Sequence, residues 1–585
     1  IFWFKHVQLL HPAKVVMTMV AEAVPLLLLL GFSARAVLGC STIVVGKGAS
    51  KSGAVLISHS DDGEGGADPR LIRVPSMTHA NGTMRRIYWD TEDYPRYVGT
   101  DFGPEYANLP GYEDSVPIGE IRQVPQTYGY WDGTYGHLND AGVAIGESTC
   151  SGMFAAQARG HGGEALFSID TLTKLAMERT SSAREAVRLM GELAEEHGFY
   201  GASGGTEGGS ENVNVGDQNE AWVMHVLPSP SGKSAIWVAR RVPDNEVTVV
   251  MNMFTIRQVN LTSPDFMYSN SMISVAKDRG WWHEGQPFDF TAIYSQGEYV
   301  HQYYSGRRIW GAYRMIAPSQ KYSPSYGNLR YDQPYPWSIK PDLPLDAQSV
   351  MAIHRDWYAG TPFDQTRGIA AGAFGSPDRF TVAPQVPGHW ERPIALFRTT
   401  FTTIEQLGGV GTSGPEDAPV NAWSWYGAGP AHYTVFVPLP ATLSQSPLSD
   451  RRGSPDKWDL TTMTTVVKKV ATVARTRFMD MIVDIQRAQQ EWEGKGIALI
   501  ANATARFLND HNAKTLEETV LAHADAAALA WNQLAEDLLS KYANGYLNTP
   551  AGNYEALGYP LPWLREVGYQ NGPPNPPKMT QSVLV

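Results

Sequence analysis

Residues 38–63 read LGCSTIVVGKGASKSGAVLISHSDDG, and this stretch decides the fold. Two runs rich in β-branched residues, Ser41–Val45 and Ala54–His59, flank a turn of Gly, Lys and Ser, a pattern that predicts a β-hairpin. Cys40, one of only two cysteines among 585 residues, stands directly before the first run. The sequence thus places a rare cysteine at the head of a predicted strand.

The segment before Cys40 has the properties of a removable secretory leader. Val24–Phe32 is an apolar run of nine residues, too short to span a bilayer and typical of the core of a signal peptide. We therefore predict that residues 1–39 are removed, by signal peptidase or autocatalytically, and that the protein has no stable membrane anchor. Cleavage is expected after Ala36 or Gly39. A buried hydrophobic helix is the alternative interpretation.

Glycosylation signals agree with a secretory route. Three N-x-[ST] sequons occur, none with Pro at the middle position, at Asn81, Asn260 and Asn502. Together with the leader they favour an extracellular location or the lumen of a lysosome- or vacuole-like compartment. Secreted proteins usually pair their cysteines, so a disulfide between Cys40 and Cys150 is one alternative for both residues.

Composition excludes some partners. The chain carries 59 acidic against 47 basic residues, so it has no positive electrostatic field that would attract nucleic acid or bind the protein to an anionic membrane. The 17 Trp and 27 Tyr fit either a large core or aromatic-lined pockets for a ligand. No cofactor is indicated, and a homo-oligomer is compatible with the sequence.

Hydrophobic periodicity predicts a mixture of strands and helices. Ser182 and Glu185 form a capping-box pattern at the start of one predicted helix. Beyond the hairpin, strands are predicted at Gly142–Glu147, Ala221–Val226, Ala235–Arg240 and Glu246–Phe254, and helices at Glu164–Glu178 and Ser182–His197. Strand runs interrupted by a helix pair suggest sheets covered by helices, an α+β fold.

The later part of the chain changes character. Residues 392–440 return to strand-like runs, whereas the tail carries helical periodicity at Leu460–Glu493, Ile497–Asn509 and Leu516–Tyr546. We therefore divide the chain into a leader, a catalytic domain at 40–450 and a mostly helical C-terminal region at 451–585.

A cysteine at a mature N-terminus has its own α-amino group as a base. An α-amine titrates at about 7.7 to 8 and a thiol at about 8.5, so proton transfer between them is almost thermoneutral at neutral pH. Nucleophile and base then belong to one residue. This chemistry requires that the bond between Gly39 and Cys40 be cut.

Several blocks resemble one known family, the secreted and bacterial cysteine dipeptidases of the N-terminal nucleophile hydrolase superfamily, which are related to penicillin V and bile-salt acylases. Individually weak, these blocks are specific together and follow the family order over most of the mature chain. They are CSTI at 40–43, ISHSDDG at 57–63, NDAGVAIGESTC at 139–150, HGFYG at 197–201, YAGTPFD at 358–364, GSPDR at 375–379 and RPIALFRT at 392–399.

The resemblance implies an αββα sandwich, a thiol-dependent dipeptidase activity and an acyl-enzyme formed on Cys40. It places Asp62 near the amine and the thiol of the nucleophile, where a carboxylate would orient the ammonium group; Asp61 is the second candidate. Many relatives carry an arginine at the position of His59, so this sequence departs from the pattern there. A histidine could keep a donor role, but its charge would depend on pH.

Hydrogen-bond donors are needed for the tetrahedral intermediate. By resemblance the candidates are Asn252, at the end of a predicted strand, and the segment containing Thr149, where the acylases show an asparagine. Arg257 could bind a substrate carboxylate through two hydrogen bonds, although an exposed arginine after a strand is common.

Other interpretations remain open at this point. No H-E-x-x-H or paired-cysteine pattern supports a metal, and the glycine-rich residues 201–211 are more consistent with a loop near the site than with a phosphate-binding turn. The same chemistry permits an acylase acting on a non-peptide amide. A non-catalytic secreted binding protein, or acylation of Cys40 in a lipobox, would leave no N-terminal nucleophile. The preferred reading is a dipeptidase that acts on a dipeptide or short peptide.

Overall fold

The computed structural model describes ten stretches of the chain: residues 39–63, 67–89, 101–108, 114–202, 209–296, 302–325, 334–380, 390–409, 417–455 and 457–572. The predicted leader lies outside the described residues except for Gly39, and most of the glycine-rich loop at 201–211 lies outside them as well. From Leu38 onward the chain forms one unit, which includes the helices after residue 450.

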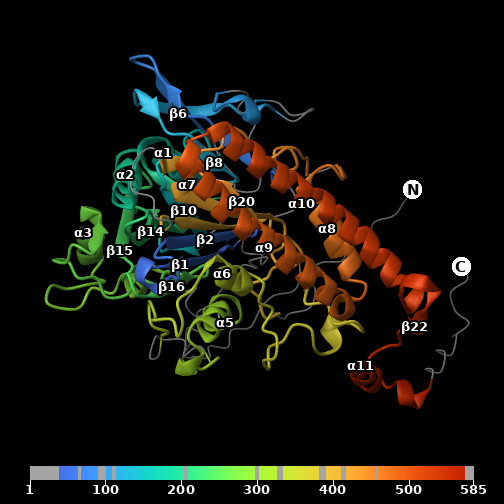
Figure 1. Cartoon of the computed structure of the whole chain (residues 1–585). Helices are drawn as coiled ribbons and strands as arrows, with labels where there is room; N and C mark the ends of the chain where they lie inside the picture. The colour runs from blue at the N-terminus through green and yellow to red at the C-terminus, as the bar shows by residue number, and fades with distance from the viewer. Residues whose placement is uncertain are drawn as a thin grey trace, which may run out of the picture. The chain divides into compact units, whose positions relative to one another are not determined.

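The predicted hairpin supplies two inner strands of a six-stranded antiparallel sheet (Figure 1). In order across the sheet the strands are β16 (Val247–Val250), β1 (Ser41–Val45), β2 (Val55–Asp61), β18 (Phe401–Leu407), β19 (Ala422–Ala428) and β20 (Val437–Pro440). The register pairs Ser41 with Ser60 and Thr42 with His59. The hairpin prediction is therefore confirmed, and β1 has the predicted bounds.

A second antiparallel sheet has eight strands. Its order is β17 (Phe266–Tyr268), β15 (Ala235–Arg241), β14 (Ala221–Pro228), β13 (Gly209–Gly216), β10 (Ala144–Ser151), β9 (Gly136–Asn139), β8 (Tyr130–Asp132) and β3 (Ile72–Val74). The predicted strands near 142, 221 and 235 are all in this sheet. The predicted strand Glu246–Phe254 is shorter than expected, because β16 ends at Val250 and the chain then turns.

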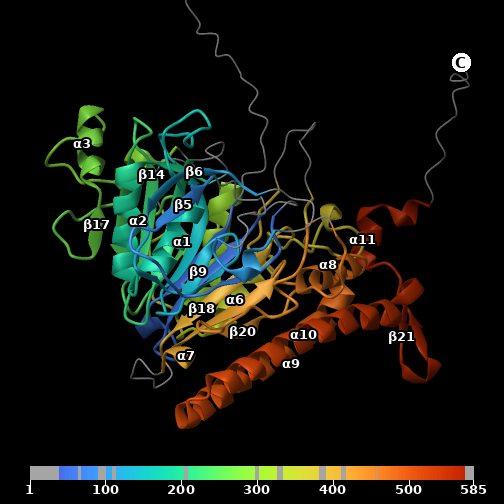
Figure 2. The same ribbon diagram turned by 90° about the horizontal axis from the view of Figure 1, so that it is seen from above.

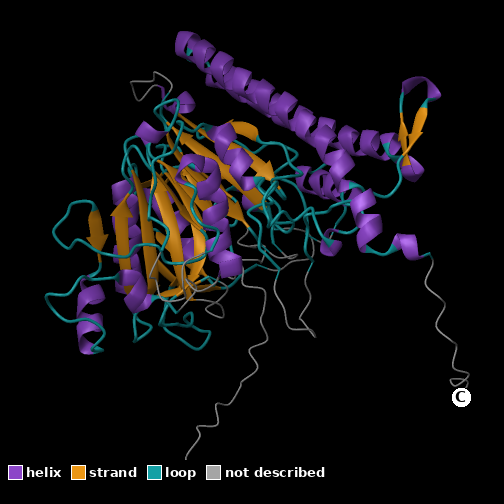
Figure 3. Ribbon diagram, turned by 90° about the horizontal axis from the view of Figure 1, so that it is seen from below, coloured by secondary structure: helices purple, strands orange, loops and turns teal. Residues whose placement is uncertain are grey.

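The two sheets pack against each other, and helices cover their outer faces (Figures 2 and 3). Helices α1 (Ile169–Arg179) and α2 (Ala183–His197) pack on the eight-stranded sheet. The six-stranded sheet contacts α5 (Arg307–Ile316), α6 (Ala347–His354), α8 (Met463–Ala474), α9 (Phe478–Asp510) and α10 (Ala513–Lys541). These layers make the fold α+β, as predicted.

Two hydrophobic cores hold the layers together. One fills the space around the six-stranded sheet and extends to the C-terminal helices, with Ile43, Ile57 and Val223 among its members. The other joins the eight-stranded sheet to α1 and α2 through residues such as Val213 and Met190. Burying an aliphatic side chain of this kind stabilises the fold by about 1.5 to 3 kcal/mol.

A glycine allows a close approach of the two sheets beside the nucleophile. A Cβ atom at Gly146 of β10 would lie 3.1 Å from His59 Cβ and 3.1 Å from the Ser58 carbonyl oxygen of β2. Any side chain at this position would push the sheets apart. The residues that follow Gly146 on β10 are thereby brought next to Cys40.

The capping-box prediction at α2 is confirmed. The Ser182 hydroxyl oxygen accepts a hydrogen bond from the Glu185 backbone N–H (3.3 Å), and the Glu185 carboxylate accepts from the backbone N–H groups of Ser181 (3.2 Å) and Ser182. The predicted helix Glu164–Glu178 begins later, at Ile169, because Phe167–Ser168 forms a short strand, β11.

The C-terminal region is helical, as predicted, but its boundaries differ. The predicted helix Leu460–Glu493 is divided between α8 and α9, and α9 continues through the predicted helix Ile497–Asn509. Helices α9 and α10 run side by side as a long antiparallel pair (Figure 1). Among the described residues, no helix combines the length and the apolar character needed to cross a membrane.

Short elements complete the described structure. The remaining helices are α3 (Asn270–Asp278), α4 (Phe290–Tyr294), α7 (Ala418–Asn421) and α11 (Leu561–Glu566). The remaining strands form the pairs β4 (Met77–Thr78) with β7 (Gln126–Thr127), β5 (Met84–Tyr88) with β6 (Pro117–Arg122), β11 with β12 (Phe199–Gly201), and β21 (Tyr546–Asn548) with β22 (Tyr554–Ala556).

Candidate active site

Cys40 lies directly before β1, where β2 and β16, the two neighbours of β1, also end. Its side chain is fully buried. Cys150 is buried too, on β10, and no disulfide joins the two cysteines. The alternative of a Cys40–Cys150 disulfide is therefore wrong for this structure, and Cys40 is present as a thiol.

Arg308 binds the backbone around the nucleophile. From the first turn of α5, its Nη1 donates to the Cys40 carbonyl oxygen (2.9 Å) and to Ser41 Oγ (3.1 Å). Its Nη2 donates to Asn252 Oδ1 (2.7 Å). Burial, and then the neighbouring Arg392 cation, lower the pKa of Arg308 to about 9, so that the guanidinium is still charged at neutral pH.

Asp62 and Arg392 form a buried ion pair next to the bond that precedes Cys40. Arg392 Nη2 donates both to Asp62 Oδ2 and to the Gly39 carbonyl oxygen. Thr399 Oγ1 donates to the other carboxylate oxygen of Asp62 (2.5 Å). The Gly39 carbonyl group, which belongs to the peptide bond before Cys40, therefore faces a cation that Asp62 holds in place.

Asn252 has a left-handed backbone conformation, with φ of 59°, two residues after the end of β16. Its backbone N–H donates to Ser148 Oγ (2.9 Å), and its Nδ2 donates to the Thr149 carbonyl oxygen (2.8 Å). A Cβ atom at Gly39 would collide with Asn252 Oδ1 and Tyr304 Oη. The small residue before Cys40 is thus required by the packing, and Asn252 lies close to Gly39.

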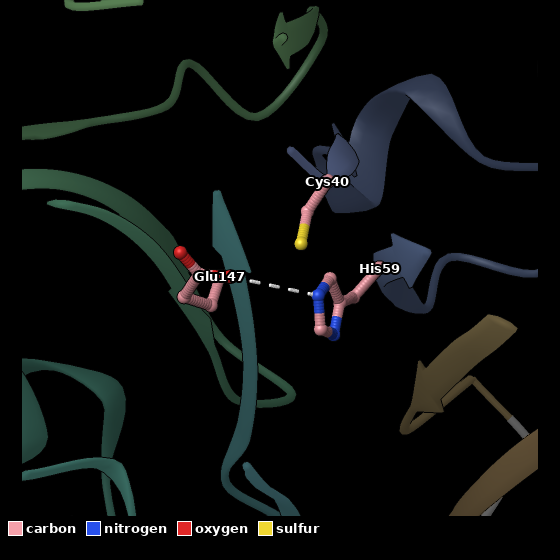
Figure 4. Close-up of side chains that lie close together, drawn as sticks. All are labelled: Cys40, His59 and Glu147. Carbon is pink, nitrogen blue, oxygen red and sulfur yellow. Dashed lines mark ion pairs between the residues drawn. The ribbon is translucent and has the colours of Figure 1, made fainter. Parts of the chain in front are cut away.

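The thiol side of Cys40 faces His59 and Glu147. Figure 4 shows the three side chains pointing toward one another, and one ligand atom from each lies within 4.8 Å of the others. His59 Nε2 is 3.8 Å from Glu147 Oε2. Cysteine, histidine and glutamate are donor types that zinc accepts. The sequence, however, has no spacing of residues that is typical of a metal site.

His59 is neutral in this environment. Burial, followed by the nearby His137 and His354, lowers the pKa of His59 to about 3. Its ring makes edge contacts with the rings of Tyr135 (5.5 Å) and Phe401 (5.7 Å). His59 therefore cannot supply the positive charge of the arginine expected there from the family, and Arg308 and Arg392 bring cations to the site from other segments.

The remaining predicted site residues, Thr149, Asp61 and Arg257, contact other side chains. The Thr149 hydroxyl donates to Glu147 Oε1 (3.2 Å), and Thr134 Oγ1 donates to Asp61 Oδ2 (3.2 Å) on β2. Arg257 forms an ion pair with Asp289 (2.6 Å). The structure thus brings Cys40, His59, Asp62, Thr149 and Asn252 into one continuous network, whereas the side chain of Arg257 contacts Asp289.

The predicted sequons differ in their surroundings. Asn81, Asn260 and Asn502 are all exposed. Asn81 and Asn260 lie in turns or loops, whereas Asn502 lies within α9 and the threonine of its sequon, Thr504, is buried.

Sequence reasoning did not single out Glu147, Arg308 or Arg392. Glu147 and Arg392 lie inside blocks that carried the family resemblance, and a lone acidic residue in the run GVAIGEST was an available signal. Arg308 lies in no recognised block, and it reaches Cys40 across 268 positions of the sequence. Only the three-dimensional structure identifies it.

A buried thiol at the head of a central strand, with a bound carbonyl group and two arginines beside it, defines a candidate thiol hydrolase. The model of peptidase family C69 matches residues 39–491, so the match begins one residue before Cys40 and covers most of the chain. The chain belongs to peptidase family C69. The predicted family resemblance and the prediction of a cysteine-type peptidase are confirmed.

Curated relatives are distant but cover most of the chain. A probable dipeptidase of Latilactobacillus sakei is 22% identical over 86% of this chain and 94% of its own length. A probable dipeptidase A of Streptococcus pyogenes is 22% identical over 82% of this chain and 92% of its own length. Dipeptidase A of Lactobacillus helveticus is 21% identical over 70% of this chain and 76% of its own length.

Proposed function

We propose that this protein is a thiol-dependent dipeptidase whose nucleophile is Cys40 at the N-terminus of the mature chain. The observation that carries the proposal is the position of the Cys40 thiol in a chain of family C69: it is buried, lies against Glu147 and His59, and directly follows a carbonyl group bound by Arg392. We infer a peptide substrate because the relatives are named as probable dipeptidases.

In the proposed reaction the α-amine of Cys40 accepts the thiol proton, and the sulfur attacks the carbonyl carbon of the peptide bond. The C–S bond forms while electrons move onto the carbonyl oxygen. The ammonium group then returns the proton to the leaving amine as the C–N bond breaks. Water hydrolyses the resulting thioester and regenerates the thiol.

Asp62 and Asn252 have supporting roles in this scheme. Asp62 fixes Arg392 next to the position that the α-amine of Cys40 would occupy, and Asn252 places an amide group on the same side. Donors held rigidly in a buried site stabilise a developing oxyanion without reorganising, an effect typically worth about 10²–10³ in kcat for one donor. We assign the oxyanion contact to Asn252 and to backbone N–H groups.

The fold and location proposed from the family go together with this function. The layered arrangement of helices and two sheets supports an αββα sandwich of the N-terminal nucleophile type. The apolar segment upstream of Cys40 and the exposed sequons support passage through the secretory pathway.

The test combines N-terminal analysis with an activity assay. The full chain is produced in a secreting host, its mature N-terminus is determined by mass spectrometry, and hydrolysis of dipeptides is measured. We expect active protein to begin at Cys40, and expect Cys40→Ser to reduce kcat at least about 10³-fold. Cys150→Ser, at the other buried thiol, is the matched control and should keep its activity. Active protein with a different N-terminus would overturn the mechanism.

A further inference from the structure

Glu147 is the acidic group nearest to the nucleophile on its thiol side. It lies on β10, it is fully buried, and its carboxyl group hydrogen bonds with the Cys40 thiol. Thr149 donates to Oε1 (3.2 Å), and the carboxyl group also hydrogen bonds with Glu211 and Tyr135. In the described sheet β9 pairs with β10 at Ala144 alone, so Glu147 lies on a stretch of β10 whose strand neighbour is β13.

The contacts of Glu147 contain no cation. Its one ion-pair partner among the described residues is His59, which is neutral because burial lowers its pKa to about 3. The two arginines of the site point elsewhere: Arg392 binds Asp62 and the Gly39 carbonyl oxygen, and Arg308 binds Asn252 and backbone oxygens. Burial raises the pKa of Glu147, as expected for a carboxylate that lacks a positive partner.

A second carboxyl group, that of Glu211, lies beside the carboxyl group of Glu147. Glu211 on β13 hydrogen bonds with Glu147 and also accepts from the Ala202 N–H (3.0 Å). Two carboxyl groups in hydrogen-bond contact share one proton, because both cannot ionise in a buried site. The pair then carries a single negative charge, which one ammonium group would neutralise.

We propose that Glu147 binds the α-ammonium group of the first residue of the substrate. This inference rests on the proposed dipeptidase function. It adds a charged subsite on the thiol side of Cys40, separate from the contacts through which Arg392 binds Asp62 and the Gly39 carbonyl oxygen.

The distances suit this role. In an amino acid the nitrogen lies about 2.5 Å from the carbonyl carbon, and a reacting sulfur lies about 3 to 3.5 Å from that carbon. An ammonium group bonds a carboxylate at about 2.7 to 2.9 Å. Cys40 Sγ and a Glu147 oxygen lie within 4.8 Å of each other, so one substrate residue can reach both atoms at once.

A charge at this distance would explain why a family member cuts after the first residue of its substrate. The carboxylate recognises an unblocked α-amine one residue from the bond to be cut, and a longer N-terminal extension or an acyl group would put an uncharged amide against a buried charge. Leaving a buried charge unpaired is costly, so such substrates would bind poorly.

The test compares alanyl-alanine with propionyl-alanine, which differs only by lacking the α-amino group. We expect the wild-type mature enzyme to prefer alanyl-alanine. Glu147→Gln, which keeps the size and the hydrogen bond from Thr149, should lower kcat/KM for alanyl-alanine at least about 30-fold, mainly through KM. The same substitution should change kcat/KM for propionyl-alanine by less than about threefold. Glu178→Gln, at a buried carboxylate of α1 paired with Arg85, is the matched control and should change neither value.

A different outcome would identify a different role. If Glu147→Gln lowers kcat/KM equally for both substrates, Glu147 acts on the thiol or on the fold, and the subsite is refuted. The rate of alkylation of Cys40 by iodoacetamide as a function of pH measures separately how far Glu147→Gln changes the thiol with which Glu147 hydrogen bonds. A loss for alanyl-alanine no larger than this change accounts for would also refute the subsite. Hydrolysis of neither substrate by the wild-type enzyme would instead refute the proposed dipeptidase function itself.

Discussion

The ion pair between Asp62 and Arg392 allows a quantitative test of how the site is held together. The side chain of Asp62 is fully buried and that of Arg392 is 7% exposed. In Asp62→Asn the amide oxygen can still accept from Arg392, and the amide N–H can donate to Thr399 Oγ1, whose own proton then goes to the Leu396 carbonyl oxygen. The substitution therefore removes the negative charge and preserves the hydrogen bonds.

The expected cost is that of leaving Arg392 buried without its anion. Removing one partner of a buried ion pair typically destabilises a protein by about 3 to 5 kcal/mol. Arg392 lies 4.4 Å from the centre of the Tyr304 ring, which stabilises the cation, while the second buried cation, Arg308, repels it. We therefore expect the lower end of the range, about 3 kcal/mol.

The assay is urea unfolding at pH 7 of wild-type protein, Asp62→Asn, Arg392→Met and the double variant, all with the same N-terminus. The double variant should recover most of the loss, since it buries neither charge. Glu284→Gln breaks an exposed pair with Lys277 and should cost less than about 1 kcal/mol. A loss below about 1 kcal/mol in Asp62→Asn would refute the view that this ion pair holds the site together.

Three further outcomes are expected. Gly146→Val should destabilise the protein by about 1 to 3 kcal/mol in thermal unfolding, because its side chain would meet His59 Cβ, only 3.1 Å from the added Cβ atom, where the two sheets pack closely. His225 Nε2 accepts from two backbone N–H groups, and burial lowers the pKa of His225 to about 3. Its contribution to stability is therefore present at pH 7 and is lost as the pH falls from about 6.5 toward 3. Between pH 7 and pH 5, His225→Gln should therefore lose less stability than wild-type protein. In a secreting host, glycans should be found by mass spectrometry at Asn81 and Asn260 but not at Asn502, whose sequon lies in a helix.

The fold was predictable where the signal is local. The β1–β2 hairpin follows from two β-branched runs around a polar turn, and α2 follows from its cap and its apolar face. The break between α8 and α9 was not predictable, because periodicity continues through it. In the structure Arg475, directly after α8, binds Asp378 (2.6 Å) from a distant loop, and this contact has no local signature.

The site divides in the same way. Cys40 and Asp62 were identified by resemblance, because they lie in short blocks that keep their order along the chain, and Asn252 was identified by resemblance at the end of a predicted strand. Arg308 could not be identified as a site residue from the sequence, because an arginine on a helix is usually a surface residue and only the fold brings it to Cys40. Arg257 was a reasonable candidate for binding a carboxylate, but its partner Asp289 lies 32 positions further on and is paired with it only by the fold.

The unexpected histidine at position 59 can now be interpreted physically. An arginine there would place a permanent cation beside Glu147, and that cation would compete with a substrate ammonium group for the carboxylate. A buried, neutral His59 fills the space without supplying charge, while Arg392 and Arg308 provide cations that bind Asp62 and the backbone around Cys40. His59→Arg should therefore weaken the binding of alanyl-alanine more than that of propionyl-alanine, and an equal effect on both substrates would separate the role of His59 from the charge of Glu147.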